Sequence, residues 1–116
     1  MPYISITTSA KMTENTKTEL KTRIGAKIPL IEGKEEAKLI INIADGCEMY
    51  MRGEKDDKIA FVNVKLFRKA KFEDKEAFVK EMYATIKDIL DIEKTNAYIN
   101  VEEYLEWGTQ GEFKKA

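Results

Sequence analysis

Residues 75–92, KEAFVKEMYATIKDILDI, contain the clearest structural signal in this sequence. Apolar side chains recur there every three or four residues, which is the spacing of a helix with one face against a core. A strand is expected on each side of this helix, at residues 59–67 and 98–101. The second half of the chain therefore predicts a strand, a helix and a strand in that order. The apolar positions of the helix are Phe78, Val79, Met82, Tyr83, Ile86 and Ile89.

The first half of the chain predicts a second unit of the same kind. Residues 3–8, YISITT, alternate apolar and polar side chains and are rich in β-branched residues, which is typical of a strand. Thr13 can cap a helix that runs to about residue 31, with a kink at Pro29. Residues 38–44, KLIINIA, form a nearly continuous apolar run, which indicates a buried strand.

Shorter segments complete the chain, with a short strand at residues 48–52, a solvated loop at residues 53–58 and a short tail after residue 101. We therefore expect a single α+β domain over residues 1–116. Two consecutive β-α-β units should form a four-stranded mixed sheet with short extra strands. Two helices should cover one face of that sheet, because a helix lies between the strands of each unit.

The composition excludes several classes of protein. Lys and Arg number 20 against 21 Asp and Glu, and this net charge of -1 argues against a general nucleic-acid binder, which needs clustered cations. No apolar run approaches the roughly 20 residues of a membrane span. The N-terminus shows no secretory signal, and the single cysteine, Cys47, excludes a disulfide within the chain. We therefore expect a cytoplasmic protein without a nucleic-acid or membrane partner.

The sequence contains no histidine, which removes Ser-His-Asp triads, Cys-His pairs and histidine zinc sites. We therefore expect no metal site. Three kinds of base remain for proton chemistry near neutral pH. They are a carboxylate with a raised pKa, a lysine with a lowered pKa, and the terminal amine, whose pKa is ordinarily about 8.

Several short motifs together resemble one known family. Pro2 follows the initiator methionine, Gly33-Lys34 closes the first helix, and Tyr98-Ile99-Asn100 lies in the last predicted strand. Trp107 and Phe113 stand near the C-terminus. In this order and spacing they resemble the macrophage migration inhibitory factor branch of the tautomerase superfamily, over essentially the whole chain. The resemblance implies a homotrimer with active sites between subunits, and a keto–enol tautomerase that acts on a small α-keto acid of the phenylpyruvate type without a cofactor.

The resemblance also implies a role for each matching residue. Pro2, exposed when Met1 is removed, matches the general base, and Lys34 matches the lysine that binds the substrate carboxylate and helps keep Pro2 neutral. Leu66 matches the strand position whose backbone contributes a contact in the family's pocket. Tyr98 and Asn100 match residues that reach in from a neighbouring subunit. The expected pocket wall consists of Tyr3, Trp107, Phe113 and Lys38, the last standing where many relatives place a tyrosine.

Other interpretations stay open. Pro2 is also a tolerated first residue of a strand, and a lysine near a helix C-terminus, such as Lys34, is ordinary dipole complementation. One rival function is a non-catalytic signalling protein that retains the pocket, and the resemblance leaves open its release without a signal peptide. Another is hydration or dehalogenation of an unsaturated acid, which usually needs extra carboxylates and arginines in the pocket. None of the three arginines, Arg23, Arg52 and Arg68, maps convincingly there.

Overall fold

Four strands form a mixed sheet in the order β2-β1-β5-β6. They are β1 (Pro2–Thr8), β2 (Ile40–Ala44), β5 (Ala60–Phe67) and β6 (Ala97–Tyr104). The outer pairs, β1–β2 and β5–β6, are parallel, and the central pair β1–β5 is antiparallel. The computed structural model describes all residues 1–116, and each parallel pair is joined by one helix. The predicted pair of β-α-β units and their four-stranded mixed sheet are confirmed.

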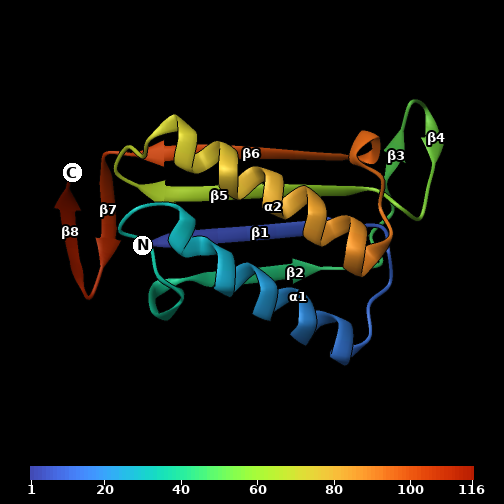
Figure 1. Cartoon of the computed structure of the whole chain (residues 1–116), viewed down its shortest axis with the longest axis horizontal. Helices are drawn as coiled ribbons and strands as arrows, with labels where there is room; N and C mark the ends of the chain where they lie inside the picture. Colours follow the sequence, from blue (N-terminus) through green and yellow to red (C-terminus); the bar gives the residue numbers. More distant parts are fainter.

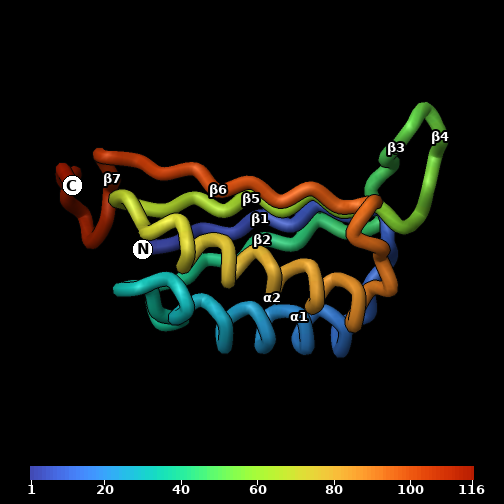
Figure 2. The backbone as a smooth tube through the Cα atoms, turned by 45° about the horizontal axis from the view of Figure 1, so that its top comes forward, coloured from blue at the N-terminus to red at the C-terminus, as the bar shows by residue number.

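The two helices lie on the same face of the sheet (Figures 1 and 2). They are α1 (Glu14–Lys27) and α2 (Phe72–Leu90). Thr13 caps α1 as predicted, because its hydroxyl accepts from the Thr16 backbone N–H at 3.1 Å. Neither helix has the length and apolar character that crossing a membrane would require.

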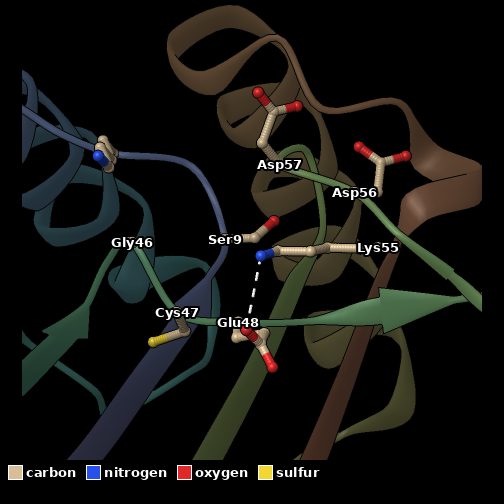
Figure 3. A pocket seen from close by; sticks show the side chains of 8 residues that line it. Ser9, Gly46, Cys47, Glu48, Lys55, Asp56 and Asp57 are labelled. Carbon is tan, nitrogen blue, oxygen red and sulfur yellow. Dashed lines mark hydrogen bonds and ion pairs between the residues drawn. The ribbon is translucent and has the colours of Figure 1, made fainter.

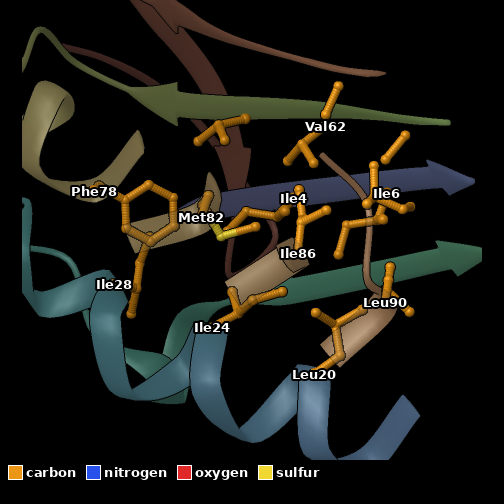
Figure 4. Packing of buried hydrophobic residues seen from close by; sticks show 14 of the residues in the cluster. Ile4, Ile6, Leu20, Ile24, Ile28, Val62, Phe78, Met82, Ile86 and Leu90 are labelled. Atoms are coloured by element: carbon orange, nitrogen blue, oxygen red, sulfur yellow. The ribbon is translucent and has the colours of Figure 1, made fainter. Parts of the chain in front are cut away.

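The core lies between the sheet and the helices (Figure 4). Alternate residues of each central strand point toward the helices, so Ile4, Ile6, Val62 and Val64 are fully buried. The helices supply the opposite layer of the core. Its fully or almost fully buried members on the helices are Leu20, Ile24, Phe78, Met82 and Ile86.

The first helix is shorter than predicted. It ends at Lys27, and a 3-10 turn, η1 (Ile28–Leu30), follows where a kinked helix to about residue 31 was expected. Pro29 has no backbone N–H to donate to the preceding turn, so the α-helical hydrogen-bond pattern stops there. A second 3-10 turn, η2 (Glu36–Lys38), leads into β2.

The expectation that residues 38–44 form a buried strand is wrong for the protomer. β2 pairs only with β1, so it is an edge strand, and Ile40 is 64% exposed. Ile41 and Ile43 pack against the core from the helix-facing side. A consecutive apolar run indicates that both faces of a strand avoid water, but it does not give the position of the strand in the sheet.

Two small hairpins lie at opposite ends of the sheet (Figure 1). One is β3 (Tyr50–Met51) with β4 (Glu54–Lys55), in the region predicted as a longer strand and a loop. The other is β7 (Glu106–Thr109) with β8 (Glu112–Lys115), which replaces the predicted tail. Both turn through two residues with positive φ, of which the second is glycine, and this is the geometry that tight hairpins favour.

The ends of the second unit also differ from the prediction by a few residues. α2 begins at Phe72 rather than near residue 75, and β6 continues to Tyr104 rather than stopping at Val101. A 3-10 turn, η3 (Lys94–Asn96), joins them. The extension of β6 matters for the site, because it carries the chain to the end of the sheet where the β7–β8 hairpin begins.

Candidate active site

A cavity of about 340 Å³ lies at the end of the sheet where β1 begins. Three segments far apart in the sequence form it, and the N-terminus and the β7–β8 hairpin lie at this same end in Figure 1. The start of β1 supplies Met1, Pro2 and Tyr3. The end of η2 and the start of β2 supply Lys38 and Ile40. The hairpin supplies Trp107, Gly108, Thr109, Gln110 and Lys114.

Pro2 lines this cavity as the first residue of β1, where the sheet fixes its position. Its side chain is buried, and it stands opposite Leu66 in the antiparallel register of β1 and β5. The Met1 carbonyl accepts from the Phe67 backbone N–H at 3.4 Å, which ties the N-terminus to the end of β5. Leu66 is fully buried with its side chain in the core, so only its backbone lies beside Pro2.

Lys34 lies next to the chain terminus, although it does not line the cavity itself. Its Nζ donates to the Phe67 carbonyl oxygen at 2.7 Å. Burial lowers the pKa of the Lys34 ammonium. Burial also lowers the pKa of the Met1 amino group, and the neighbouring Lys34 cation lowers it further, to about 6. An amine at this position is therefore mostly neutral at pH 7.

Aromatic side chains form the walls of the cavity. Trp107 stacks on Phe67 with ring centroids 6.2 Å apart and an interplanar angle of 22°, and its centroid lies 6.0 Å from that of Tyr104. Tyr3 also lines the cavity, and Asn42 donates to its hydroxyl at 3.3 Å. These contacts hold the two aromatic rings that line the cavity, Tyr3 and Trp107, in place.

Tyr98 and Asn100 lie elsewhere in the same protomer. Tyr98 is paired with Phe61, whereas Pro2 is paired with Leu66, five residues further along β5. This separation corresponds to about 17 Å along a strand. Both side chains are exposed, and the Asn100 amide oxygen accepts from Asn63 at 2.7 Å. One protomer therefore does not bring Tyr98 and Asn100 to the cavity.

The sequence reasoning placed Phe113 in the pocket wall, but within one protomer it does not line this cavity. It pairs with Gly108 across the hairpin and is 76% exposed, beside Tyr104 and Leu105. Conversely, Ile40, Lys114 and the segment from Gly108 to Gln110 line the cavity and were not predicted. The available signal was Gly111, because glycine readily adopts the positive φ of a tight hairpin turn, and such a turn pairs Lys114 with Trp107.

A second hollow lies at the opposite end of the sheet (Figure 3). Within it, the Lys55 ammonium lies 3.5 Å from the Glu48 carboxylate, while Ser9 and Asp56 bond to groups outside its lining. The Cys47 thiol donates to the Ala44 carbonyl at 3.5 Å. No group of three His, Cys, Asp or Glu side chains comes together anywhere in the chain to hold a metal ion. This hollow offers neither an apolar wall nor a group prepared for proton transfer, so the cavity at Pro2 is the better candidate.

The fold matches solved structures over nearly the whole of both chains. Leishmania major MIF2 has a TM-score of 0.88 at 16% sequence identity, covering 98% of this chain and 97% of that chain. The macrophage migration inhibitory factor-like protein from Entamoeba histolytica has a TM-score of 0.83 at 22% identity, covering 97% of this chain and 98% of that chain. The wild-type R7 fused 4-OT, an asymmetric trimer, has a TM-score of 0.82 at 14% identity, covering 95% and 94%.

No protein-family model matches this sequence, and no curated protein sequence matches it either. The identities to these solved structures are low, so the similarity establishes the architecture and not the activity. The chain therefore has the fold of the tautomerase superfamily, in the form that it shares with the macrophage migration inhibitory factor proteins.

Proposed function

We propose that this chain is a cofactor-independent keto–enol tautomerase whose general base is the amine of Pro2 after removal of Met1. The observation that carries the proposal is the environment of the amine at the start of β1. In the chain that retains Met1, the terminal amino group of Met1, one residue before Pro2, is desolvated, lies beside the Lys34 cation and has a pKa lowered to about 6. A neutral amine beside a cavity lined in part by the rings of Tyr3 and Trp107 is suited to accept a proton near neutral pH.

The same causes act on Pro2 once it becomes the terminal residue. Its side chain is buried, whereas that of Met1 is half-buried, so desolvation disfavours the ammonium form of Pro2 too. Lys34 is held on the carbonyl of Phe67, the residue after the one paired with Pro2. We therefore expect the Pro2 amine to have a lowered pKa as well.

The proposed reaction moves one proton between carbon and oxygen of a small α-keto acid. In the ketonisation direction, the Pro2 amine takes the proton of the enol hydroxyl, and the resulting prolinium ion gives a proton to C3 as the C=O bond forms. No proton is consumed overall. The Lys34 ammonium would pair with the substrate carboxylate, and the rings of Tyr3 and Trp107 would contact the body of a phenylpyruvate-type substrate.

We further propose that the protein works as a homotrimer with active sites between subunits. The free edge of β2 and the exposed Ile40 support this, because an open apolar edge strand favours pairing with another chain. The trimeric assembly of the R7 fused 4-OT, which has the same fold, also supports it. In this arrangement Tyr98 and Asn100 of a neighbouring subunit would complete the cavity.

Removal of Met1 and ketonisation of phenylpyruvate test the proposal together. Intact-mass measurement identifies protein that has lost one methionine, and the decay of the enol absorbance gives kcat/KM. Pro2→Gly keeps a free terminal amine but replaces the secondary amine, and we expect it to lose about 10²- to 10⁴-fold in kcat/KM. Lys21→Ala, on the exposed surface of α1, serves as the control and should leave kcat/KM unchanged.

The rival function is a non-catalytic interaction protein with the same cavity. Correctly processed protein that turns over neither phenylpyruvate nor a dopachrome analogue would favour it and reject the tautomerase proposal. Turnover that persists in Pro2→Gly at the level of the unaltered protein would likewise reject Pro2 as the base.

A further inference from the structure

Two lysines from segments far apart in the sequence line the cavity that Pro2 also lines. Lys38 lies at the end of η2, and Lys114 lies on β8. Their side chains remain 52% and 39% exposed, so both cations are accessible from solvent. No aspartate or glutamate lines this cavity. Its charged lining is therefore entirely positive.

The acidic neighbours of these lysines neutralise them only weakly. The Lys38 ammonium lies 3.6 Å from the Glu35 carboxylate, and the Lys114 ammonium lies 4.0 Å from the Glu112 carboxylate. All four side chains are exposed, and ion pairs of this kind contribute little because water screens them. A bound anion can therefore displace these pairs at small cost.

Positive charge is thus present at two places in the site, beside the terminal amine and in the cavity lining. Lys34 lies beside the terminal amine. Lys38 and Lys114 lie in the cavity lining, and apolar surface from Tyr3, Ile40 and Trp107 lines the same cavity. The Lys38 cation also contributes to the lowered pKa of the amine, which places it within electrostatic reach of the reacting position. A ligand that fits all of these groups has an apolar body and an anionic group at each end.

We propose that Lys38 and Lys114 bind a second carboxylate, so that the preferred substrates are dicarboxylic α-keto acids and their enols. The first carboxylate is the one beside the keto group, at Lys34, and the second is at the remote end of the molecule. This inference rests on the proposed tautomerase function for its kinetic test. It adds a specificity that the tautomerase reaction by itself does not require.

The test compares substrates that differ only at the remote end. Phenylpyruvates with a carboxylate or a methyl group at the para position share the same body and differ in the charge at that end. On protein without Met1 and at low ionic strength, we expect the carboxylate substrate to have a kcat/KM about tenfold higher than the methyl one. The ratio should fall as salt is added, because the two lysines are exposed.

A double variant then assigns the preference to these residues. Lys38→Met with Lys114→Met removes both cations at similar side-chain length, and the ratio should fall to about one. Lys21→Met with Lys80→Met changes the net charge equally at exposed positions of α1 and α2, and should keep the ratio of the unaltered protein. A ratio of one or less in the unaltered protein, or an unchanged ratio in the first double variant, would overturn the inference while leaving the tautomerase proposal intact.

A binding measurement separates this inference from the proposed activity. If processed protein turns over none of these substrates, the tautomerase proposal fails. Ligand affinities then test whether Lys38 and Lys114 bind a second carboxylate. Calorimetric titration with phenylacetates carrying the same para carboxylate or methyl group should again give a preference of about tenfold for the dicarboxylate, lost in the Lys38 and Lys114 double variant. Equal affinities for the two ligands would reject the site.

Discussion

The Nζ of Lys34 donates to the backbone carbonyl of Phe67 at 2.7 Å, and this contact fixes a cation beside the first strand. Phe67 is itself tied to the terminus, because its N–H donates to the Met1 carbonyl. The end of β5 therefore sets the position of the lysine relative to the terminal amine. Both groups depend on backbone atoms rather than on other side chains, so their separation follows from the sheet register.

The stability of the form that retains Met1 should rise between pH 6 and 8. The pKa of its amino group is about 6 in the folded chain and 8.0 ordinarily, so the unfolded chain binds more protons in this range. With no histidine in the sequence, this amine is the main group that titrates there. Chemical denaturation across this pH range measures the effect. N-terminal acetylation should abolish it, and an equally steep rise in the acetylated protein would contradict the assignment.

The pH dependence of tautomerisation should report the Pro2 amine. Because Pro2 acts as a base, kcat/KM should fall as the pH falls through the lowered pKa of its amine and the amine becomes protonated. Lys34→Ala removes one cause of the lowered pKa, so the acid limb of the profile should move toward pH 8. Lys34→Arg keeps the cation and should keep the limb near its original position. A limb that does not move in Lys34→Ala would exclude the electrostatic role of Lys34.

Two inactive variants should restore activity when they are mixed in one assembly. Pro2→Gly lacks the base and Tyr98→Ala lacks the residue expected from the neighbouring subunit, and the two positions are about 17 Å apart along one sheet. In a randomly mixed trimer, about a quarter of the sites combine an intact Pro2 with an intact Tyr98. Co-expression followed by a phenylpyruvate assay measures this. Mixed assemblies with no more activity than the parent variants would place both residues outside a shared site.

Gly111→Ala should weaken ligand binding through the β7–β8 hairpin. Gly111 has a φ of 79°, and a side chain there costs about 1 kcal/mol. The distortion would move Trp107 and Lys114, so KM should rise. Gly53→Ala creates the same strain in the β3–β4 hairpin at the far end of the sheet, where φ is also 79°. It should lower stability comparably and leave KM unchanged, and a similar rise of KM in both variants would indicate a general effect of instability.

Phe78→Ala should be among the most destabilising single changes on α2. Phe78 is fully buried between α2 and the sheet, and its removal leaves a large cavity that costs about 3–5 kcal/mol. Phe72, at the start of the same helix, is largely exposed, and Phe72→Ala should change stability by less than about 0.5 kcal/mol. Equilibrium urea unfolding of both variants gives the comparison. Equal losses would mean that Phe72 is covered in solution.

The sequence predicted the fold well where side-chain periodicity was strong. The apolar positions of α2 repeat so regularly that its existence and its buried face could be read directly, and both neighbouring strands followed. The position of β2 at the edge of the sheet could not be predicted from the sequence. An apolar run such as that of β2 is expected whether a neighbouring strand of the same chain or another subunit covers it. The β7–β8 hairpin was missed because its residues are mostly polar on both faces, and its only strong signal is the turn.

The candidate site was harder to predict because it depends on contacts between distant segments. The shortage of bases pointed to the terminal amine at Pro2, whereas Lys34 and Trp107 were assigned to the site only by the resemblance. The convergence of Lys38 and Lys114 on one cavity depends on the hairpin folding back over the end of β1. No local pattern in the sequence contains that information.

The hydrogen bond between the Met1 carbonyl and the Phe67 N–H has a consequence for how the protein matures. Cleavage of Met1 removes the acceptor together with the residue, so Phe67 keeps a backbone N–H with no partner from β1. The event that would create the base therefore also uncovers a hydrogen-bond donor beside it. The initiator methionine therefore occupies two groups at once, the Pro2 nitrogen through its peptide bond and the Phe67 N–H through its carbonyl. Any tag or blocking group that leaves Met1 in place would keep both groups occupied.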